Sequence, residues 1–257
     1  MTLISKRKQP GRETHMAREQ LRIEEGVFDS RTMMRLSKLF AKGVVSRMRF
    51  VIAKGKEADV YLADAGNEID KEYVALKIFR IENTPFQKRM RYITGDPRFG
   101  KIKSDMFSVV NEWCKKEYGN LLVAEAAEIH APMPYAFNGH ILALEFIGEG
   151  GTPATPMRHV KLQDPEKVLG IVLEDVRKLY QNELVHADLS EYNILMRDEV
   201  PYLIDFGQAV HTKHPESMKF LIRDVENLLH YFSKTYKVEK EFDEVMEYIT
   251  KEPTAAP

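Results

Sequence analysis

Two carboxylates and one amide stand at fixed spacing within an otherwise apolar stretch of the chain: Asp188, Asn193 and Asp205. Asn193 follows Asp188 by five positions, and Asp205 ends an apolar run, 202–204, ahead of Phe206-Gly207. A carboxylate can orient or deprotonate a nucleophile, and hard oxygen ligands hold the Mg²⁺ that bridges nucleotide phosphates. The residue types therefore predict phosphoryl transfer, with Asp188 and Asp205 catalytic and with Asn193 and Asp205 as metal ligands.

The same stretch matches two motifs of protein kinases: the catalytic loop H-x-D-x-x-x-x-N from His186, and the metal-binding D-F-G at Asp205. Apolar residues on both sides predict short strands that hold the polar groups in place. A β-hairpin with Asp and Asn in ordinary turns is the alternative for either motif alone. The two motifs in this order favour the kinase site, in which His186 would anchor the loop through a hydrogen bond.

A strand, a turn and a second strand at 49–63 predict the loop that covers the nucleotide. Gly55 lets backbone N–H groups approach phosphates, and the lysines on either side add positive charge. With one glycine the pattern taken alone favours a plain hairpin, but its position ahead of the next strand favours the loop. The residues expected to contact the nucleotide here are Lys54, Gly55, Lys56, Glu57 and Val60.

Residues 73–79, Tyr-Val-Ala-Leu-Lys-Ile-Phe, predict a buried strand that carries one lysine. Lys77 would contact the α- and β-phosphates, and a buried ammonium requires an anionic partner. The helix expected at 108–126 offers Glu112 and Glu117, of which we favour Glu117. The alternatives are a solvent-facing lysine on an edge strand and a solvated glutamate on the helix.

Residues 141–148 predict another buried strand that leads into a link between two lobes. By position alone, the Glu145 carbonyl and the Ile147 amide would bind the edge of adenine. The long segment 80–107, rich in Arg, Lys, Gly and Pro, has no periodic pattern. Such a segment inside a compact domain is typical of a functional or disordered loop, and we expect it to be mobile.

Apolar periodicity predicts four more helices, at 31–45, 164–183, 219–234 and 242–249. The first would be capped by Asp29 or Ser30 and ended by Gly43. The second has Asp164 as a cap. Asp224, in the third, is expected to anchor the catalytic loop.

Length and composition fit a globular protein: 257 residues, 44% hydrophobic and 30% charged, can bury a core and form two lobes. The apolar runs are too short to cross a membrane, and the single cysteine, Cys114, indicates a reducing compartment. We therefore expect a cytoplasmic protein, monomeric and without a membrane partner. Residues 1–50 carry a net charge of +7 and the remainder −8. This basic arm predicts an anionic partner such as RNA, and a solvated helix face is an equal alternative.

Taken together, these segments resemble the RIO kinases, in particular the archaeal Rio1-type branch, over residues 45–252. The segments that carry the resemblance are Lys54–Tyr61, Val74–Phe79, Trp113–Glu117, Val185–Leu195 and Ile204–Gln208. The resemblance implies an atypical serine/threonine kinase and ATPase that uses ATP with Mg²⁺, or Mn²⁺ in its place. It also implies a phosphoaspartate on Asp205, and a role in maturation of the small ribosomal subunit with rRNA or ribosomal proteins as partners.

The expected fold is α+β: a bilobal, protein-kinase-like fold whose C-lobe lacks an activation segment and peptide-docking helices. The expected segments are a basic N-terminal extension with a helix (1–46), an N-lobe (47–147) and a C-lobe (148–257). A small-molecule kinase of the aminoglycoside-phosphotransferase type shares H-x-D-x-x-x-x-N but usually carries a large helical insert, for which this chain has little room. A non-catalytic nucleotide-binding assembly factor is the third hypothesis; the presence of the four key polar residues argues against it.

Overall fold

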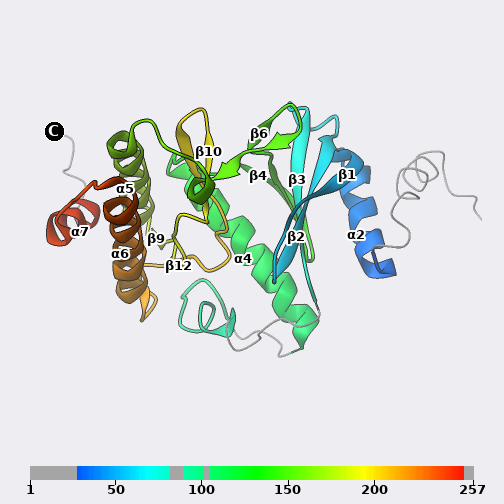
Figure 1. Ribbon diagram of the computed structural model, residues 1–257. Coiled ribbons are helices and arrows are strands. Elements are labelled where there is room, and N and C mark those ends of the chain that lie inside the picture. The colour runs from blue at the N-terminus through cyan, green and yellow to red at the C-terminus, as the bar shows by residue number, and fades with distance from the viewer. Residues whose placement is uncertain (1–27, 82–88, 101–104, 252–257) are drawn as a thin grey trace, which may run out of the picture.

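In the computed structural model the chain is described over residues 28–81, 89–100 and 105–251 (Figure 1). Five antiparallel strands form one sheet in the order β1-β2-β3-β5-β4. Helix α2 (Ser30–Ala41) packs on one side of this sheet and α4 (Met106–Ala126) on the other. The strands are β1 (Val45–Lys54), β2 (Ala58–Ala65), β3 (Tyr73–Phe79), β4 (Pro134–Asn138) and β5 (Ile141–Glu145).

Strand β3 has a hydrogen-bonded neighbour on both sides, so its side chains alternate between two covered faces. Val74, Leu76 and Ile78 belong to the hydrophobic cluster that contains the α2 leucines. Ala75 and Phe79 belong to the cluster that contains Val110 and Trp113 of α4. The alternation therefore directs the intervening Lys77 toward α4.

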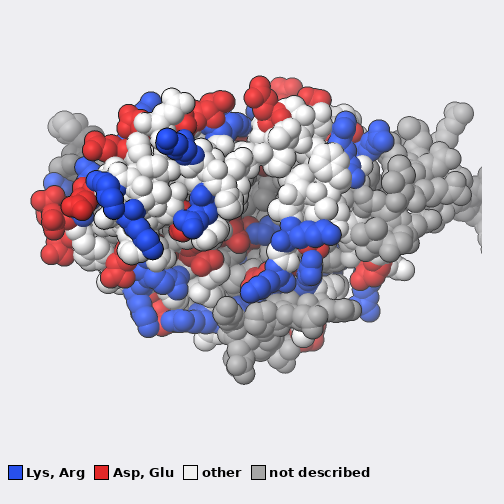
Figure 2. All heavy atoms as spheres, viewed as in Figure 1, with Lys and Arg blue, Asp and Glu red and all other residues white. Residues whose placement is uncertain are grey.

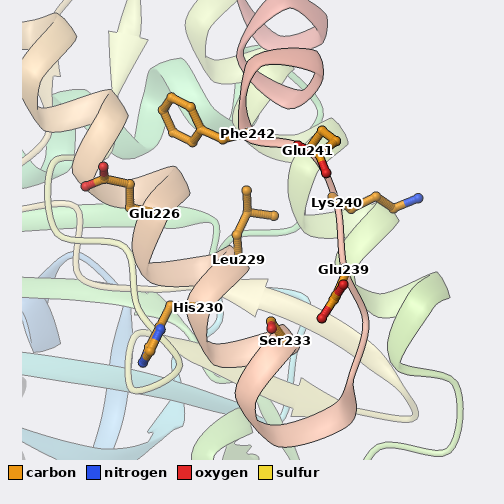
Figure 3. A pocket seen from close by; sticks show the side chains of 8 residues that line it. All are labelled: Glu226, Leu229, His230, Ser233, Glu239, Lys240, Glu241 and Phe242. Carbon is orange, nitrogen blue, oxygen red and sulfur yellow. The ribbon is translucent and has the colours of Figure 1, made fainter.

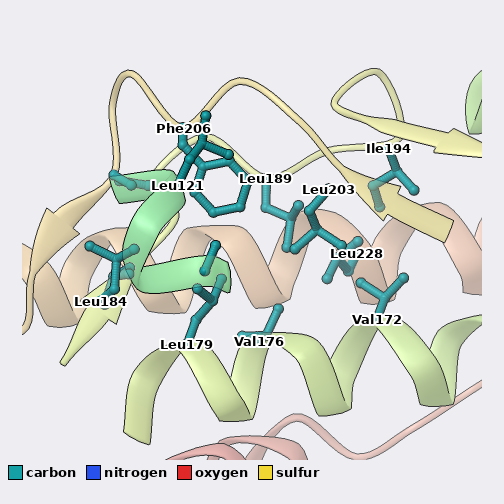
Figure 4. Packing of buried hydrophobic residues seen from close by; sticks show 14 of the residues in the cluster. Leu121, Val172, Val176, Leu179, Leu184, Leu189, Ile194, Leu203, Phe206 and Leu228 are labelled. Atoms are coloured by element: carbon teal, nitrogen blue, oxygen red, sulfur yellow. The ribbon is translucent and has the colours of Figure 1, made fainter. Parts of the chain in front are cut away.

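The described residues after β5 form short strands, three α-helices and one short 3-10 helix around the main core (Figure 1). Figure 4 shows Leu189 and Leu203 pointing into the same cluster as Val172 of α5 and Leu228 of α6. This packing fixes the loops that carry the two kinase motifs. The elements are β6 (Gly148–Glu149), β7 (Thr152–Pro153), β8 (Thr155–Pro156), η2 (Met157–His159), α5 (Pro165–Gln181), β9 (Leu184–Val185), β10 (Ile194–Arg197), β11 (Val200–Leu203), β12 (Val210–His211), α6 (Ser217–Tyr236) and α7 (Phe242–Thr250).

Two local expectations need correction. Helix α2 is capped as predicted, with Asp29 Oδ1 accepting from the Thr32 N–H at 2.7 Å. It ends at Ala41, however, whereas the sequence predicted a helix to residue 45. Gly43 has a φ of +68°, which turns the chain, and the next residues enter β1 at Val45. Strand β4 was not predicted, because the prolines before it suggested only a break.

Part of the segment expected to be mobile is buried against the rest of the fold. Residues 82–88 and 101–104 lie outside the described residues, but within 89–100 the Arg89 and Asp96 side chains are buried. Asp96 accepts hydrogen bonds from Arg98 Nη2 at 2.7 Å and from the His211 N–H at 3.2 Å. Mobility of the segment remains a prediction. Across the described parts of the chain, no helix is long and apolar enough to cross a bilayer.

Candidate phosphoryl-transfer site

Lys77, Glu117 and Asp205 form one charged cluster, although each comes from a different part of the fold. Lys77 Nζ donates to Glu117 Oε1 at 2.7 Å and Oε2 at 2.9 Å, and to Asp205 Oδ1 at 2.9 Å. The predicted pairing with Glu117 is confirmed; Glu112 instead lies 3.7 Å from Lys115 on the helix surface. Because β3 is a central strand, the edge-strand alternative for Lys77 is wrong.

The electrostatics of this cluster favour the charged forms of Lys77 and Asp205. Burial would lower the pKa of Lys77, but the Asp205 and Glu117 carboxylates outweigh burial and raise it. Partial desolvation would raise the pKa of Asp205, but Lys77 holds it below its ordinary value. Burial raises the pKa of Glu117, and Lys77 opposes that shift. Two carboxyl groups beside one ammonium, with the Asp205 carboxyl held ionised, suit a site for a cation.

Helix α6 binds the backbone of the catalytic loop through Asp224. Asp224 accepts the Ala187 N–H at 2.7 Å and the Leu189 N–H at 3.0 Å, so its predicted role as an anchor is confirmed. Ala187 has a φ of +63°, a left-handed conformation that these bonds help to impose. His186 Nε2 donates to the Ile204 carbonyl at 3.0 Å, which confirms that this ring anchors the loop and ties it to the strand before Asp205.

Asp188 lies where that loop faces the cluster. Gln208 Nε2 donates to Asp188 Oδ2 at 2.7 Å, and Asn193 Nδ2 donates to the Asp188 carbonyl at 2.8 Å. Burial raises the pKa of Asp188 to about 6, and the nearby Asp205 carboxylate adds to the shift. A carboxylate with this pKa can both accept and release a proton near neutral pH.

Asn193 and Asp205 present oxygens of the kind that Mg²⁺ prefers. The Asn193 amide nitrogen is turned toward Asp188, and no described residue donates to the Asn193 Oδ1 atom. The Asp205 side chain is 46% exposed at the floor of the site. Within the described ranges no group of three or more His, Cys, Asp or Glu residues could hold a metal. One amide and one carboxylate still fit Mg²⁺, which keeps several waters and shares phosphate oxygens.

The residues predicted to contact the nucleotide occupy two places. The turn between β1 and β2 is closed by the Gly55 N–H, which donates to the Ala58 carbonyl at 2.9 Å. Lys54 and Lys56 are exposed on this turn, and Val60 pairs in register with Lys77. Glu145 and Ile147 lie at the other place, the link between β5 and β6. Their roles in nucleotide binding stay predictions.

Figure 2 shows acidic and basic side chains meeting near the middle of one face, between the large sheet and the helical part. A separate hollow of about 400 Å³ lies between the end of α6 and the start of α7 (Figure 3). Charges of both signs line it, and none of the residues in the Lys77 cluster does. This hollow is therefore not the candidate site.

Sequence reasoning missed four polar residues near the site: Arg89, Lys116, Asn120 and Gln208. The Arg89 side chain is 1% exposed and donates to Glu57 Oε2 at 3.3 Å, and no described residue accepts a hydrogen bond from its Nε or Nη1. Lys116 and Asn120 are buried on the inner face of α4. Only Gln208 carried a usable signal, because it directly follows the D-F-G motif.

The comparisons with known proteins agree with this geometry. A RIO domain matches residues 59–245. The RIO-type serine/threonine-protein kinase Rio1 of Methanocaldococcus jannaschii is 38% identical over 90% of this chain and 78% of its own length. The chain belongs to the RIO family. Rio1 of Thermoplasma acidophilum is 40% identical over 70% of this chain and 95% of its own.

Solved structures place this RIO protein in the protein-kinase-like fold. The Rio2 kinase–ADP/Mg²⁺–phosphoaspartate complex from Chaetomium thermophilum is similar with a TM-score of 0.66, 21% identity, and coverage of 86% of this chain and 67% of that one. Another structure of that Rio2 kinase gives a TM-score of 0.64, with 20% identity and coverage of 92% and 77%. The predicted fold class is confirmed.

Proposed function

We propose that this RIO protein transfers the terminal phosphoryl group of ATP to serine or threonine hydroxyls, and that it also hydrolyses ATP. The observation that carries the proposal is the cluster of Lys77, Glu117 and Asp205 beside Asp188. Its relatives are named serine/threonine-protein kinases, and the family match covers all four residues.

Each residue has a part that follows from its surroundings. Glu117 holds Lys77 protonated and extended, so that the ammonium can bind the α- and β-phosphates. Asp188 orients the attacking hydroxyl and accepts its proton as the O–P bond forms and ADP departs. Asn193 and Asp205 would hold Mg²⁺, with Mn²⁺ as a substitute. When bound, the metal supplies positive charge that neutralises the phosphate oxygens.

The ATPase reaction would use Asp205 as a nucleophile. A carboxylate oxygen of Asp205 attacks the terminal phosphorus, ADP leaves, and water then cleaves the acyl phosphate to regenerate the carboxylate and release phosphate. The low pKa of Asp205 beside Lys77 keeps it ionised for this attack. The similar Rio2 kinase structure from Chaetomium thermophilum is a complex with ADP, Mg²⁺ and phosphoaspartate, which supports the proposal.

The wider biological setting belongs to the same proposal. We place the protein in the cytoplasm as a monomer that acts on the precursor of the small ribosomal subunit. The net charge of +7 over residues 1–50 supports contact of this arm with rRNA or an acidic face of a ribosomal protein. Segments 1–46, 47–147 and 148–257 would serve as extension, N-lobe and C-lobe, with adenine held at Glu145 and Ile147.

The test is incubation with γ-labelled ATP and Mg²⁺, followed by hydroxylamine, on wild type, Asp188→Asn and Asp205→Asn. Label on Asp205 is removed by hydroxylamine and is absent from Asp205→Asn, whereas phosphoserine and phosphothreonine survive. Asp188→Asn should bind ATP as wild type does and lose transfer to hydroxyls. Wild type that neither acquires label nor consumes ATP would refute the proposal and favour a non-catalytic assembly factor.

A further inference from the structure

Helix α4 contacts the segment after Asp205 as well as Lys77. Lys116 Nζ donates to the Gly207 carbonyl at 3.0 Å and also to the Ala209 carbonyl. Asn120 Nδ2 donates to the Phe206 carbonyl at 2.7 Å and to the Ala209 carbonyl at 3.0 Å. Three backbone carbonyls, all within four residues of Asp205, are therefore bound by one helix.

Lys116 is unusual because its buried amino group donates to peptide carbonyls, and because burial lowers its pKa to about 7. Its side chain is 1% exposed, and no carboxylate in the described part of the chain lies within ion-pair distance. Burying an ammonium without a carboxylate partner is costly, and the two carbonyls offset only part of that cost, so this side chain is expensive in a purely structural role. A hydrophobic residue would fill the same space without that cost.

The contact is also closely packed and supported from behind. A Cβ atom at Gly207 would lie 2.9 Å from Trp113 Nε1, so the backbone rests against the indole ring. Asn120 Oδ1 accepts from Arg98 Nη1 at 2.8 Å, which orients its amide nitrogen toward the loop. Trp113, Lys116 and Asn120 follow one another at helical spacing, so they share the α4 face that also carries Glu117.

We propose that Lys116 and Asn120 are positioning residues that hold the Asp205 loop in its metal-binding orientation. Protein kinases need both the Lys–Glu pair and the D-F-G aspartate in place, and helix position and activation-loop phosphorylation control this. Here one face of α4 provides Glu117, which pairs with Lys77, and the same face binds the loop that follows Asp205. The site then stays assembled without the help of an activation loop, for which the nine residues between Gly207 and α6 leave little room. The inference rests on the proposed function in that it assigns Asp205 to metal-dependent nucleotide binding.

The test compares Lys116→Met with Lys115→Met, its matched control. Lys115 is the preceding residue on the same helix, is 59% exposed, and forms a surface ion pair with Glu112. Trp113 is the single tryptophan of the chain and is 2% exposed, so its fluorescence reports on the packing of the loop. Acrylamide quenching of Trp113 and ATP affinity with and without Mg²⁺ would be measured on folded, full-length proteins.

In Lys116→Met, acrylamide quenching of Trp113 should increase. The ratio of ATP affinity with Mg²⁺ to that without it should fall about tenfold, which corresponds to the free energy of about one hydrogen bond. Affinity without Mg²⁺ should stay within about twofold, since Lys77 and Glu117 are untouched. Lys115→Met should match wild type in every measurement. Loss of affinity equally with and without Mg²⁺ would overturn the inference, because it would indicate a general structural role.

Two further outcomes are distinguishable. If wild type shows no Mg²⁺-dependent ATP binding, the proposed function fails, while Trp113 quenching still tests whether Lys116 holds the loop. If Lys116→Met does not fold, Asn120→Ala, which keeps the lysine, takes its place in the same measurements. Wild-type quenching and wild-type Mg²⁺ dependence in the folded variant would overturn the inference.

Discussion

The Lys77–Glu117 pair should contribute a large coupling energy to stability. At 2.7 Å, two unit charges attract with about 6 kcal/mol if the effective dielectric constant is about 20. Desolvation opposes this, because the Lys77 side chain is 12% exposed and that of Glu117 is 1% exposed. Removing only one partner leaves a buried charge, which typically costs about 3–5 kcal/mol.

The perturbation is a double-mutant cycle with Lys77→Met, Glu117→Leu and the combination, measured by urea unfolding at neutral pH. Glu117→Leu should lower the free energy of unfolding by about 2–3 kcal/mol, which is less than the typical cost because Asp205 still neutralises Lys77. Lys77→Met should cost more, since it leaves two carboxylates facing each other. The double variant should be less destabilised than the sum by about 2 kcal/mol or more.

The exposed pair Lys115–Glu112, on the same helix, provides the control cycle. Its charges are 3.7 Å apart, 59% and 35% exposed, and should couple by about 0.2–0.5 kcal/mol. Additive effects in the Lys77 cycle, within about 0.5 kcal/mol, would refute the reasoning that the buried pair is formed and energetically coupled.

Three further predictions concern Asp188, its anchor Asp224, and His140, which contacts Thr32 and Arg35 of α2. Because burial raises the pKa of Asp188 to about 6, turnover should rise with pH through that value and level off above about 7, and a flat profile would contradict its role as a base. Asp224→Ala should lower the free energy of unfolding by about 2–4 kcal/mol, because two buried N–H groups lose their acceptor; a loss under about 1 kcal/mol in urea titrations would contradict this. Burial lowers the pKa of His140 to about 4, below its unfolded value of about 6.5, so the unfolded state binds the extra proton between these values. Stability should therefore fall by up to about 3 kcal/mol as pH drops from 6.5 to 4, and the fall should be smaller in His140→Gln.

The parts of the site that the sequence predicts are those whose signals are local. Asp164 caps α5 through the Lys167 N–H at 3.0 Å, as the Asp-Pro pair indicates, and β3 spans the residues expected. Pairing of Lys77 with Glu117 joins residues forty positions apart, yet the need of a buried ammonium for an anion was enough to predict it. Strand β4 was missed because it begins with a proline, although the two-residue turn Gly139-His140 joins it to β5.

Helix α4 shows why the rest was not predictable. Its apolar stripe is imperfect in the sequence, and the gaps coincide with Lys116, Glu117 and Asn120, which are nevertheless buried. A pattern based on hydrophobicity treats such positions as solvent-facing, because charged residues are seldom buried unless they are paired. The partners here are Lys77 and the carbonyls after Asp205, which reach α4 only through the tertiary fold. When an apolar stripe is interrupted on a helix that packs against a catalytic loop, the polar residues in the gaps are therefore candidates for buried hydrogen bonds and ion pairs to that loop. Such positions are candidates for functional residues.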